Sequence, residues 1–124
     1  MPIVDHNAVS EVPWRPGYRT WDIAGPANGM STTLTYAVAE AGTGAPLHQH
    51  EDEELIVVLE GAVEAQLGDE VRTVGAEHTL AIPANVPHAF TVVGDAGAKL
   101  LVYFPVPDPF SRTTYLEGSR PEGI

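Results

Sequence analysis

Turn-forming residues divide this chain into many short segments, and their spacing is the strongest constraint on its fold. The runs between the turns are rich in Val, Ile, Leu, Thr, Tyr and Phe, which favour strands. No long stretch keeps a helical period with caps at both ends. Short strands separated by turns predict an all-β sandwich or barrel. The turn clusters are Gly25-Pro26, Gly42 to Pro46, Gly61, Gly68-Asp69, Gly75, Pro83 to Pro87 and Gly94 to Gly97.

Two of the predicted strands differ in how they are covered. Residues 62–67 alternate apolar and polar side chains, as in a strand with one face on the core and the other in solvent. Residues 56–59, Ile-Val-Val-Leu, are apolar on both faces. This second strand therefore needs cover on both sides, from the core and from a flanking segment or a partner subunit.

The chain of 124 residues is long enough for one domain with one hydrophobic core. We expect the barrel core to span residues 31–104. Residues 1–30 contain Trp14, Tyr18 and Trp21 beside Pro and Gly, and we expect them to wrap around the barrel or a partner. Residues 105–124 are rich in Pro and Gly and predict an irregular arm.

Composition narrows the possible classes of function. The chain has no cysteine, so disulfides, thiolate metal sites and cysteine nucleophiles are excluded. Its formal net charge of −11 repels phosphate backbones and argues against nucleic-acid binding. No apolar run approaches the roughly 18 residues of a membrane span, and the N-terminus lacks the pattern of a signal peptide. We therefore expect a cytoplasmic protein.

Three histidines and one glutamate suggest a metal site. His48 and His50 lie two residues apart, so on a strand both imidazoles point to the same side. Glu54 follows four residues later, and His88 follows a Pro-Ala-Asn-Val-Pro turn. Three imidazoles and one carboxylate form a plausible ligand set for a first-row divalent metal ion.

The spacing of these residues resembles that of the cupin family. The family's first motif is matched in full by Gly42-x5-His48-x-His50-x3-Glu54-x6-Gly61. Its second motif is matched in part by Pro83-Ala-Asn85-x2-His88. Asn85 stands where the family usually has Gly, and Asn tolerates a left-handed conformation better than most residues. The resemblance spans roughly residues 31–104.

This resemblance implies a cupin double-stranded β-helix, a jelly-roll-like barrel in a single domain. It implies that His48, His50, Glu54 and His88 ligate one divalent metal ion, which in family members is Fe, Mn, Ni, Zn or Cu. Four such ligands leave two adjacent positions of an octahedron for water, dioxygen or a substrate. Because family members commonly pair through a sheet, and because residues 56–59 need cover, we expect a homodimer.

The family contains dioxygenases, decarboxylases, isomerases and lyases, and also proteins without catalysis. We expect a divalent-metal-dependent enzyme that acts on a small organic molecule, first of all an oxygenase that uses Fe(II) and O2. One alternative is a non-oxidative lyase, decarboxylase or isomerase that uses Mn, Ni or Zn. The other is a non-catalytic small-molecule-binding or sensor protein, because fold and function are loosely coupled.

Strand alternation predicts the residues that line the cavity beside the metal. Ile56 and Val58 share the face of Glu54, and Phe90 and Val92 share the face of His88. These four apolar side chains suit a small and partly hydrophobic guest.

Polar candidates for the same cavity are few. Tyr36 either presents its phenol to a substrate or packs in the core. Proton transfer falls to metal-bound water, Glu54 or Tyr36. Arg19 either holds a substrate carboxylate at the cavity mouth or lies on the surface.

Overall fold

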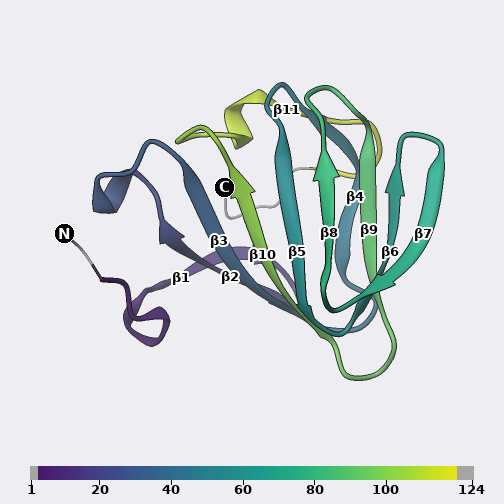
Figure 1. Ribbon diagram of the computed structural model, residues 1–124, viewed down its shortest axis with the longest axis horizontal. Helices are drawn as coiled ribbons and strands as arrows, with labels where there is room; N and C mark the ends of the chain where they lie inside the picture. The colour runs from purple at the N-terminus through teal and green to yellow at the C-terminus, as the bar shows by residue number, and fades with distance from the viewer. Residues whose placement is uncertain (1–2, 120–124) are drawn as a thin grey trace.

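The computed structural model describes residues 3–119 and confirms the predicted all-β architecture. Two antiparallel sheets face each other (Figure 1), with the strand orders β1-β2-β3-β10-β5-β8 and β11-β4-β9-β6-β7. The strands are β1 (Glu11–Arg15), β2 (Tyr18–Ala24), β3 (Thr33–Ala39), β4 (Gly44–His50), β5 (Glu54–Glu60), β6 (Ala62–Leu67), β7 (Glu70–Gly75), β8 (His78–Ile82), β9 (His88–Val93), β10 (Ala98–Phe104) and β11 (Thr113–Tyr115).

Helix in residues 3–119 is confined to three single turns of 3-10 helix. None of these helices is long or apolar enough to cross a membrane. They are η1 (His6–Ala8), η2 (Pro26–Asn28) and η3 (Phe110–Arg112).

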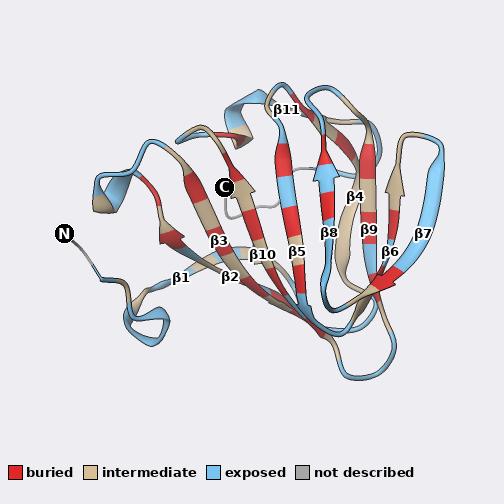
Figure 2. Cartoon of the chain, viewed as in Figure 1, coloured by how far each residue is buried: buried red, intermediate tan, exposed pale blue. Residues whose placement is uncertain are grey.

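The hydrophobic core lies between the two sheets and is built by strand alternation. Along β5 and β10, buried residues alternate with less buried ones (Figure 2). Ile56, Val63 and Leu100 are at most 1% exposed, and each such side chain contributes about 1.5–3 kcal/mol through burial. The core comprises Tyr18, Ala37, Ala39, Ile56, Val58, Val63, Ala65, Val74, Leu80, Ile82, Phe90, Val92, Ala98, Leu100, Val102 and Phe104.

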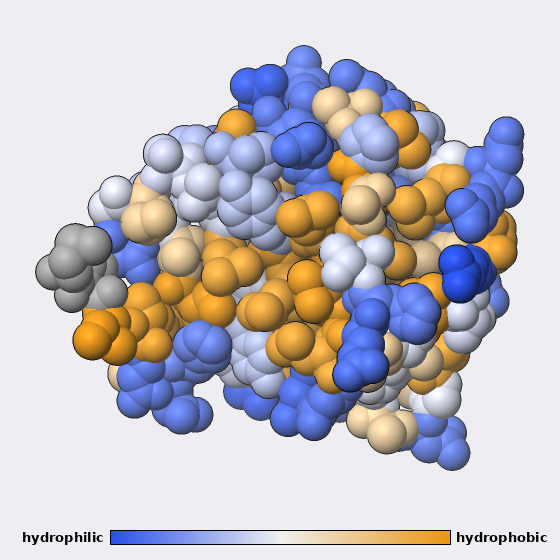
Figure 3. All heavy atoms as spheres, viewed as in Figure 1, coloured by the Kyte–Doolittle hydropathy of each residue, from blue (hydrophilic) through white to orange (hydrophobic). Residues whose placement is uncertain are grey.

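The outer face of the six-stranded sheet is also apolar. Strand register places Trp21 beside Tyr36, Tyr36 beside Leu101, and Leu101 beside Val57. A second row joins Leu34, Tyr103 and Leu55 in the same way. Figure 3 shows apolar side chains gathered across the face on which β3, β10 and β5 lie in Figure 1. The strand predicted to be apolar on both faces thus lies in a sheet whose two faces are both apolar.

Both terminal segments join the sheets. The β1–β2 hairpin extends the six-stranded sheet beyond β3, and β11 pairs with β4 at the edge of the five-stranded sheet. In that pairing Thr113 lies opposite His50, and Tyr115 lies opposite His48. The terminal segments therefore reach the part of the barrel that carries the predicted metal ligands.

Candidate metal centre

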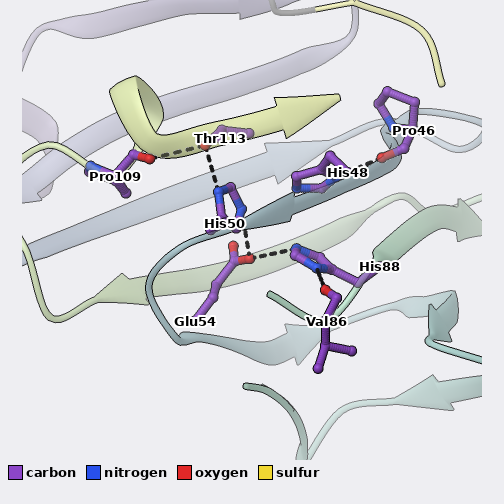
Figure 4. Close-up of polar contacts among 8 residues, drawn as sticks. All are labelled: Pro46, His48, His50, Glu54, Val86, His88, Pro109 and Thr113. Carbon is purple, nitrogen blue, oxygen red and sulfur yellow. Dashed lines mark hydrogen bonds and ion pairs between the residues drawn. The ribbon is translucent and has the colours of Figure 1, made fainter. Parts of the chain in front are cut away.

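The four predicted ligands meet inside the barrel. His48 and His50 come from β4, Glu54 begins β5, and His88 begins β9. All four side chains are buried, and one ligand atom from each lies within 4.8 Å of the others. Figure 4 shows His50, Glu54 and His88 pointing toward one another, with His48 beside them.

The backbone around the second motif holds His88 in place. Asn85 has a φ of 63°, the left-handed conformation that the sequence suggested Asn would tolerate there. Its N–H donates to the carbonyl of His50 over 2.7 Å. The turn before β9 is thus attached to the end of β4, and this attachment explains why residues 38 positions apart share one site.

The Nδ1 atom of each histidine is held by an oxygen on the side away from the centre. His48 donates to the carbonyl of Pro46 over 2.6 Å, and His88 donates to the carbonyl of Val86 over 2.9 Å. A carbonyl can only accept, so both rings carry their proton on Nδ1. Their Nε2 lone pairs therefore remain available to a metal ion.

His50 is oriented by a side chain from the C-terminal segment. Its Nδ1 lies 2.6 Å from the hydroxyl oxygen of Thr113, and that hydroxyl donates its proton to the carbonyl of Pro109 over 3.0 Å (Figure 4). The hydroxyl must then accept from His50, which places the proton of His50 on Nδ1 as well. All three imidazoles consequently present Nε2 as a donor atom to one point.

Glu54 supplies the negative charge of the group. Its Oε1 lies 2.9 Å from Nε2 of His88 and 3.3 Å from Nε2 of His50. Burial acts to raise the pKa of Glu54, but the hydrogen bond with His88 and the charges of His50 and His88 outweigh it and lower the pKa to about 2. Glu54 is therefore ionised at neutral pH and serves as an anionic ligand.

Two of the ligand histidines, His48 and His88, have pKa values that are shifted in opposite directions. Burial, the largest cause, and the charge of His88 lower the pKa of His48 to about 4, so its ring is neutral at pH 7. Burial also acts to lower the pKa of His88, but its hydrogen bond to Glu54 and the charge of Glu54 outweigh this and raise it. A proton at His88 therefore competes with any metal ion for Nε2.

The donor set fits a divalent metal ion. Nε2 of His50 is buried without a hydrogen-bond partner in residues 3–119, although the carboxylate oxygen of Glu54 lies nearby. A lone pair and a carboxylate oxygen repel unless a cation stands between them. Bonds of about 2.1 Å to one ion place donors about 3–4 Å apart, in keeping with the compact group here. His48, His50, Glu54 and His88 could therefore hold one metal ion.

Three of the four ligands, His48, His50 and Glu54, line a cavity of about 140 Å³. Aromatic rings form much of the remaining wall. Trp14 packs against Phe110 with ring centroids 5.1 Å apart, and Tyr18 packs against Phe90 at 6.2 Å. The other lining residues are Val12, Arg15, Thr20, Asp22, Thr35, Ala45, Ile56, Val102, Phe104 and Tyr115.

The structure places the predicted pocket residues in three different environments. Ile56 and Phe90 line the cavity. Val58 and Val92 face inward as predicted, but each is 1% exposed and packs in the core away from the cavity. Their strands continue past the cavity, so only the residues nearest the ligands reach it.

Tyr36 requires a correction. It lies on the outer face of the six-stranded sheet, where its ring packs 5.7 Å from Trp21, so it neither lines the cavity nor packs in the core. On β3 the small residues Thr35 and Ala37 face inward, while the larger Leu34 and Tyr36 face outward, so size misleads as a guide to the inner face.

Arg19 also lies on the surface, which was one of its two predicted places. Its guanidinium pairs with Glu11 at 3.1 Å and stacks over Trp21 at 5.0 Å. Its hairpin neighbour Arg15 lines the cavity instead.

Sequence reasoning missed the residues that the terminal segments bring to the cavity. Trp14, Arg15 and Tyr18 come from the β1–β2 hairpin, and Phe110 and Tyr115 come from the C-terminal segment. The Pro16-Gly17 turn between two aromatic-rich runs was the available signal for a hairpin. It indicates that the two strands pair, but not which face of the hairpin meets the barrel.

Comparison with known proteins agrees with this geometry. The sequence profile of the cupin domain matches residues 35–104, more than half of the chain. The chain belongs to the cupin family. Comparison with curated proteins finds no match.

Solved structures similar to this cupin include several described as enzymes or cupins. The polyketide cyclase RemF from Streptomyces resistomycificus is 24% identical, with a TM-score of 0.79 over 99% of this chain and 89% of that chain. A cupin described as RmlC-like from Shewanella frigidimarina is 14% identical, with a TM-score of 0.77 over 90% of this chain and 95% of that chain.

Oxalate decarboxylase from Bacillus subtilis is a further similar structure. It is 16% identical, with a TM-score of 0.74, and the match covers 94% of this cupin and 33% of that chain. Another structure of the same decarboxylase is described as having Mn(II) centres. Identities this low establish a shared fold and no shared activity.

Proposed function

We propose that this cupin is a metal-dependent enzyme that acts on a small organic molecule with a flat, largely apolar body. One observation carries the proposal: three histidine nitrogens and one carboxylate oxygen converge beside a cavity whose other walls are largely apolar and include six aromatic side chains. Such a cavity excludes water from the body of a guest and leaves its polar end beside the ligand group.

The residues of the chain divide the work. His48, His50 and His88 are oriented by acceptors at Nδ1, and Glu54 is kept ionised, so all four are arranged before an ion arrives. A bound first-row divalent ion would supply Lewis-acid chemistry, polarising an oxygen atom of the guest. Aromatic walls would hold a flat guest in one orientation, and orientation lowers the barrier of the reaction.

We favour a non-oxidative reaction of the lyase, decarboxylase, cyclase or isomerase type. Two similar structures are described as a cyclase and a decarboxylase. The cavity also contains a cation and a phenol, Arg15 and Tyr18, whose N–H and O–H groups are suited to hydrogen-bonding oxygen atoms of a guest.

An Fe(II)- and O2-dependent oxygenase is the second candidate, as the sequence first indicated. The ligand set supports it, because imidazole and carboxylate suit iron, and four protein ligands leave adjacent positions open. Removing O2 separates the two candidates. An oxygenase loses turnover without O2, whereas a non-oxidative enzyme keeps it.

The test begins with the metal content of the purified protein. Metal-loaded protein is then incubated with small oxygen-donor molecules, including catechol, acetylacetone and aromatic carboxylic acids, with and without O2. Mass spectrometry should detect loss of water or CO2, or isomerisation, with the wild type and not with His50→Ala. Gain of oxygen atoms would favour the oxygenase. Molecules that bind and return unchanged would indicate a binding protein.

A further inference from the structure

Two polar side chains of the β1–β2 hairpin line the cavity and take no part in the ligand group. Arg15 and Tyr18 lie directly opposite each other in the hairpin register, so their side chains project from the same face. Both line the cavity. They therefore form a cross-strand pair that faces the guest.

The turn between them holds this pair in place. Gly17 has a φ of 75°, which favours Gly, and its carbonyl accepts a hydrogen bond of 2.8 Å from the N–H of Glu40. A Cβ atom at Gly17 would lie only 2.7 Å from a carboxylate oxygen of Glu40. The hairpin is thus attached to the end of β3, and the pair is positioned before any guest binds.

Arg15 has unused hydrogen-bonding capacity. Its Nη2 donates to the carbonyl of Ser119 over 2.6 Å, and its guanidinium lies 6.0 Å from the ring centroid of Tyr115. Its Nε is shielded from solvent and has no acceptor in residues 3–119. A guanidinium has five N–H donors and suits the two oxygens of a carboxylate.

Tyr18 complements this cation as a neutral donor. It is 6% exposed, and it lines the cavity. Burial and the negative charge of Glu54 raise the pKa of Tyr18 well above its ordinary value, against the opposing effect of Arg15. The phenol therefore keeps its proton and can donate it in a hydrogen bond.

The charges around the cavity favour an anionic guest once a metal ion is present. Glu54 and Asp22 are the acidic residues of the lining, and Asp22 also accepts a hydrogen bond from Thr35 over 3.0 Å. A divalent ion offsets both carboxylates, which leaves the charge of Arg15 unbalanced. An anion with a short, flat body would meet this charge and the aromatic walls together.

We propose that Arg15 and Tyr18 bind the carboxylate of the substrate, and that the substrate is a small, flat carboxylic acid. A cavity of about 140 Å³ has room for roughly one six-membered ring. This inference rests on the proposed function and specifies its substrate class. Arg15 and Tyr18 are then the residues that determine specificity for an acid over its neutral analogue.

Benzoate and benzamide provide a matched pair of probes, because they share a shape and differ in charge. Isothermal titration of Zn-loaded wild-type protein should show benzoate binding about ten- to a hundred-fold more tightly than benzamide. In Arg15→Gln that ratio should fall close to one. In Tyr18→Phe it should fall by about three- to ten-fold. Partial unfolding would weaken both probes by the same factor and leave the ratio unchanged, and circular dichroism identifies a variant that does not fold.

Two control variants come from the outer face of the same sheet. Arg19→Gln removes a neighbouring arginine, and Tyr103→Phe removes a phenol that faces away from the cavity. Both should keep the wild-type ratio. In the wild type, the ¹⁵Nε–H resonance of Arg15 should shift on addition of benzoate and stay in place with benzamide, which tests the contact without any substitution.

Several outcomes would overturn the inference. These are a wild-type ratio near one, failure of both probes to bind at millimolar concentration, or a ratio that survives in Arg15→Gln because the metal ion alone holds the anion. Metal content is measured in the same samples. Full metal occupancy combined with equal binding of benzoate and benzamide contradicts the carboxylate site but not the metal-dependent function. Low occupancy with a ratio that depends on Arg15 contradicts the metal-dependent function and leaves the carboxylate site in place.

Discussion

The two sheets contribute different chemistry to the same cavity. The five-stranded sheet supplies three imidazoles and the hydroxyl of Thr113 that orients His50. The six-stranded sheet supplies one ligand, Glu54, together with Arg15 and Tyr18 on its terminal hairpin. One sheet mainly holds the ion and the other mainly shapes the space for a guest. Metal binding and guest recognition should therefore respond separately to substitutions in the two sheets.

The outer faces of the two sheets also differ, because one is polar and the other is apolar. On the five-stranded sheet Glu64 lies between Thr73 and Thr91, and all three are exposed. On the six-stranded sheet the corresponding rows are formed by Trp21, Tyr36 and other apolar residues. A polar outer face needs no cover, whereas an apolar one is typical of a surface that meets another protein.

The largest expected effect is the loss of a ligand from the five-stranded sheet. His50→Ala should reduce metal occupancy to background, because only three donors remain and an Nε2 that lies 3.3 Å from the Glu54 carboxylate is gone. Elemental analysis after loading and dialysis measures occupancy, and circular dichroism checks that the β fold remains. His78→Ala, an exposed histidine of the other sheet, is the matched control and should load normally. Normal occupancy in His50→Ala would remove it from the ligand set.

Acidification should weaken metal binding next. Metal binds the neutral ring of His88, whose pKa is raised by Glu54 despite burial. Below that raised pKa a proton occupies the site, so affinity should fall by up to tenfold per pH unit, and above it affinity should be flat. Competition with a chelator at several pH values between 8 and 6 measures this. Equal affinities across the range would contradict the competition at His88.

A smaller effect is expected from the residue that orients His50. Thr113→Val keeps the shape of the side chain but removes the acceptor for the Nδ1 proton. Metal affinity should fall by about tenfold, the lower end of the usual effect of such partners. Thr114→Val, at the next and exposed position of β11, should bind metal normally. The ratio of benzoate to benzamide binding should be the same in both variants, because neither Thr113 nor Thr114 lines the cavity.

The division between metal ligands and cavity-shaping residues also explains how much of this protein could be predicted from its sequence. The ligands occupy a local pattern: two histidines with the strand period of two, a glutamate at the start of the next strand, and His88 after a Pro-rich turn. Asn85 supplied a local conformational argument, which its φ of 63° confirms. Short-range chemistry of this kind can be deduced before the fold is known.

The cavity lining contributed by the terminal segments could not be predicted, because it depends on contacts between segments far apart in the sequence. Arg15 meets the carbonyl of Ser119, 104 residues away, and Thr113 reaches His50 across 63 residues. On β3, Tyr36 was expected to face the cavity or the core, but the structure turns it outward together with Leu34. Which face turns inward is decided by the space between the sheets, where Thr35 and Ala37 fit.

The smallest effect concerns the apolar outer face, where we still predict a homodimer. Leu59 on β5 is 41% exposed on this face, and Val71 on β7 of the other sheet is 62% exposed. Leu59→Ala should cost about 0.5 kcal/mol per copy through lost apolar burial, or about fivefold in the dimer Kd when both copies change. Val71→Ala should change nothing. Light scattering across a dilution series measures both, and a monomeric wild type at micromolar concentration would leave the apolar face without a second copy of this chain as its cover.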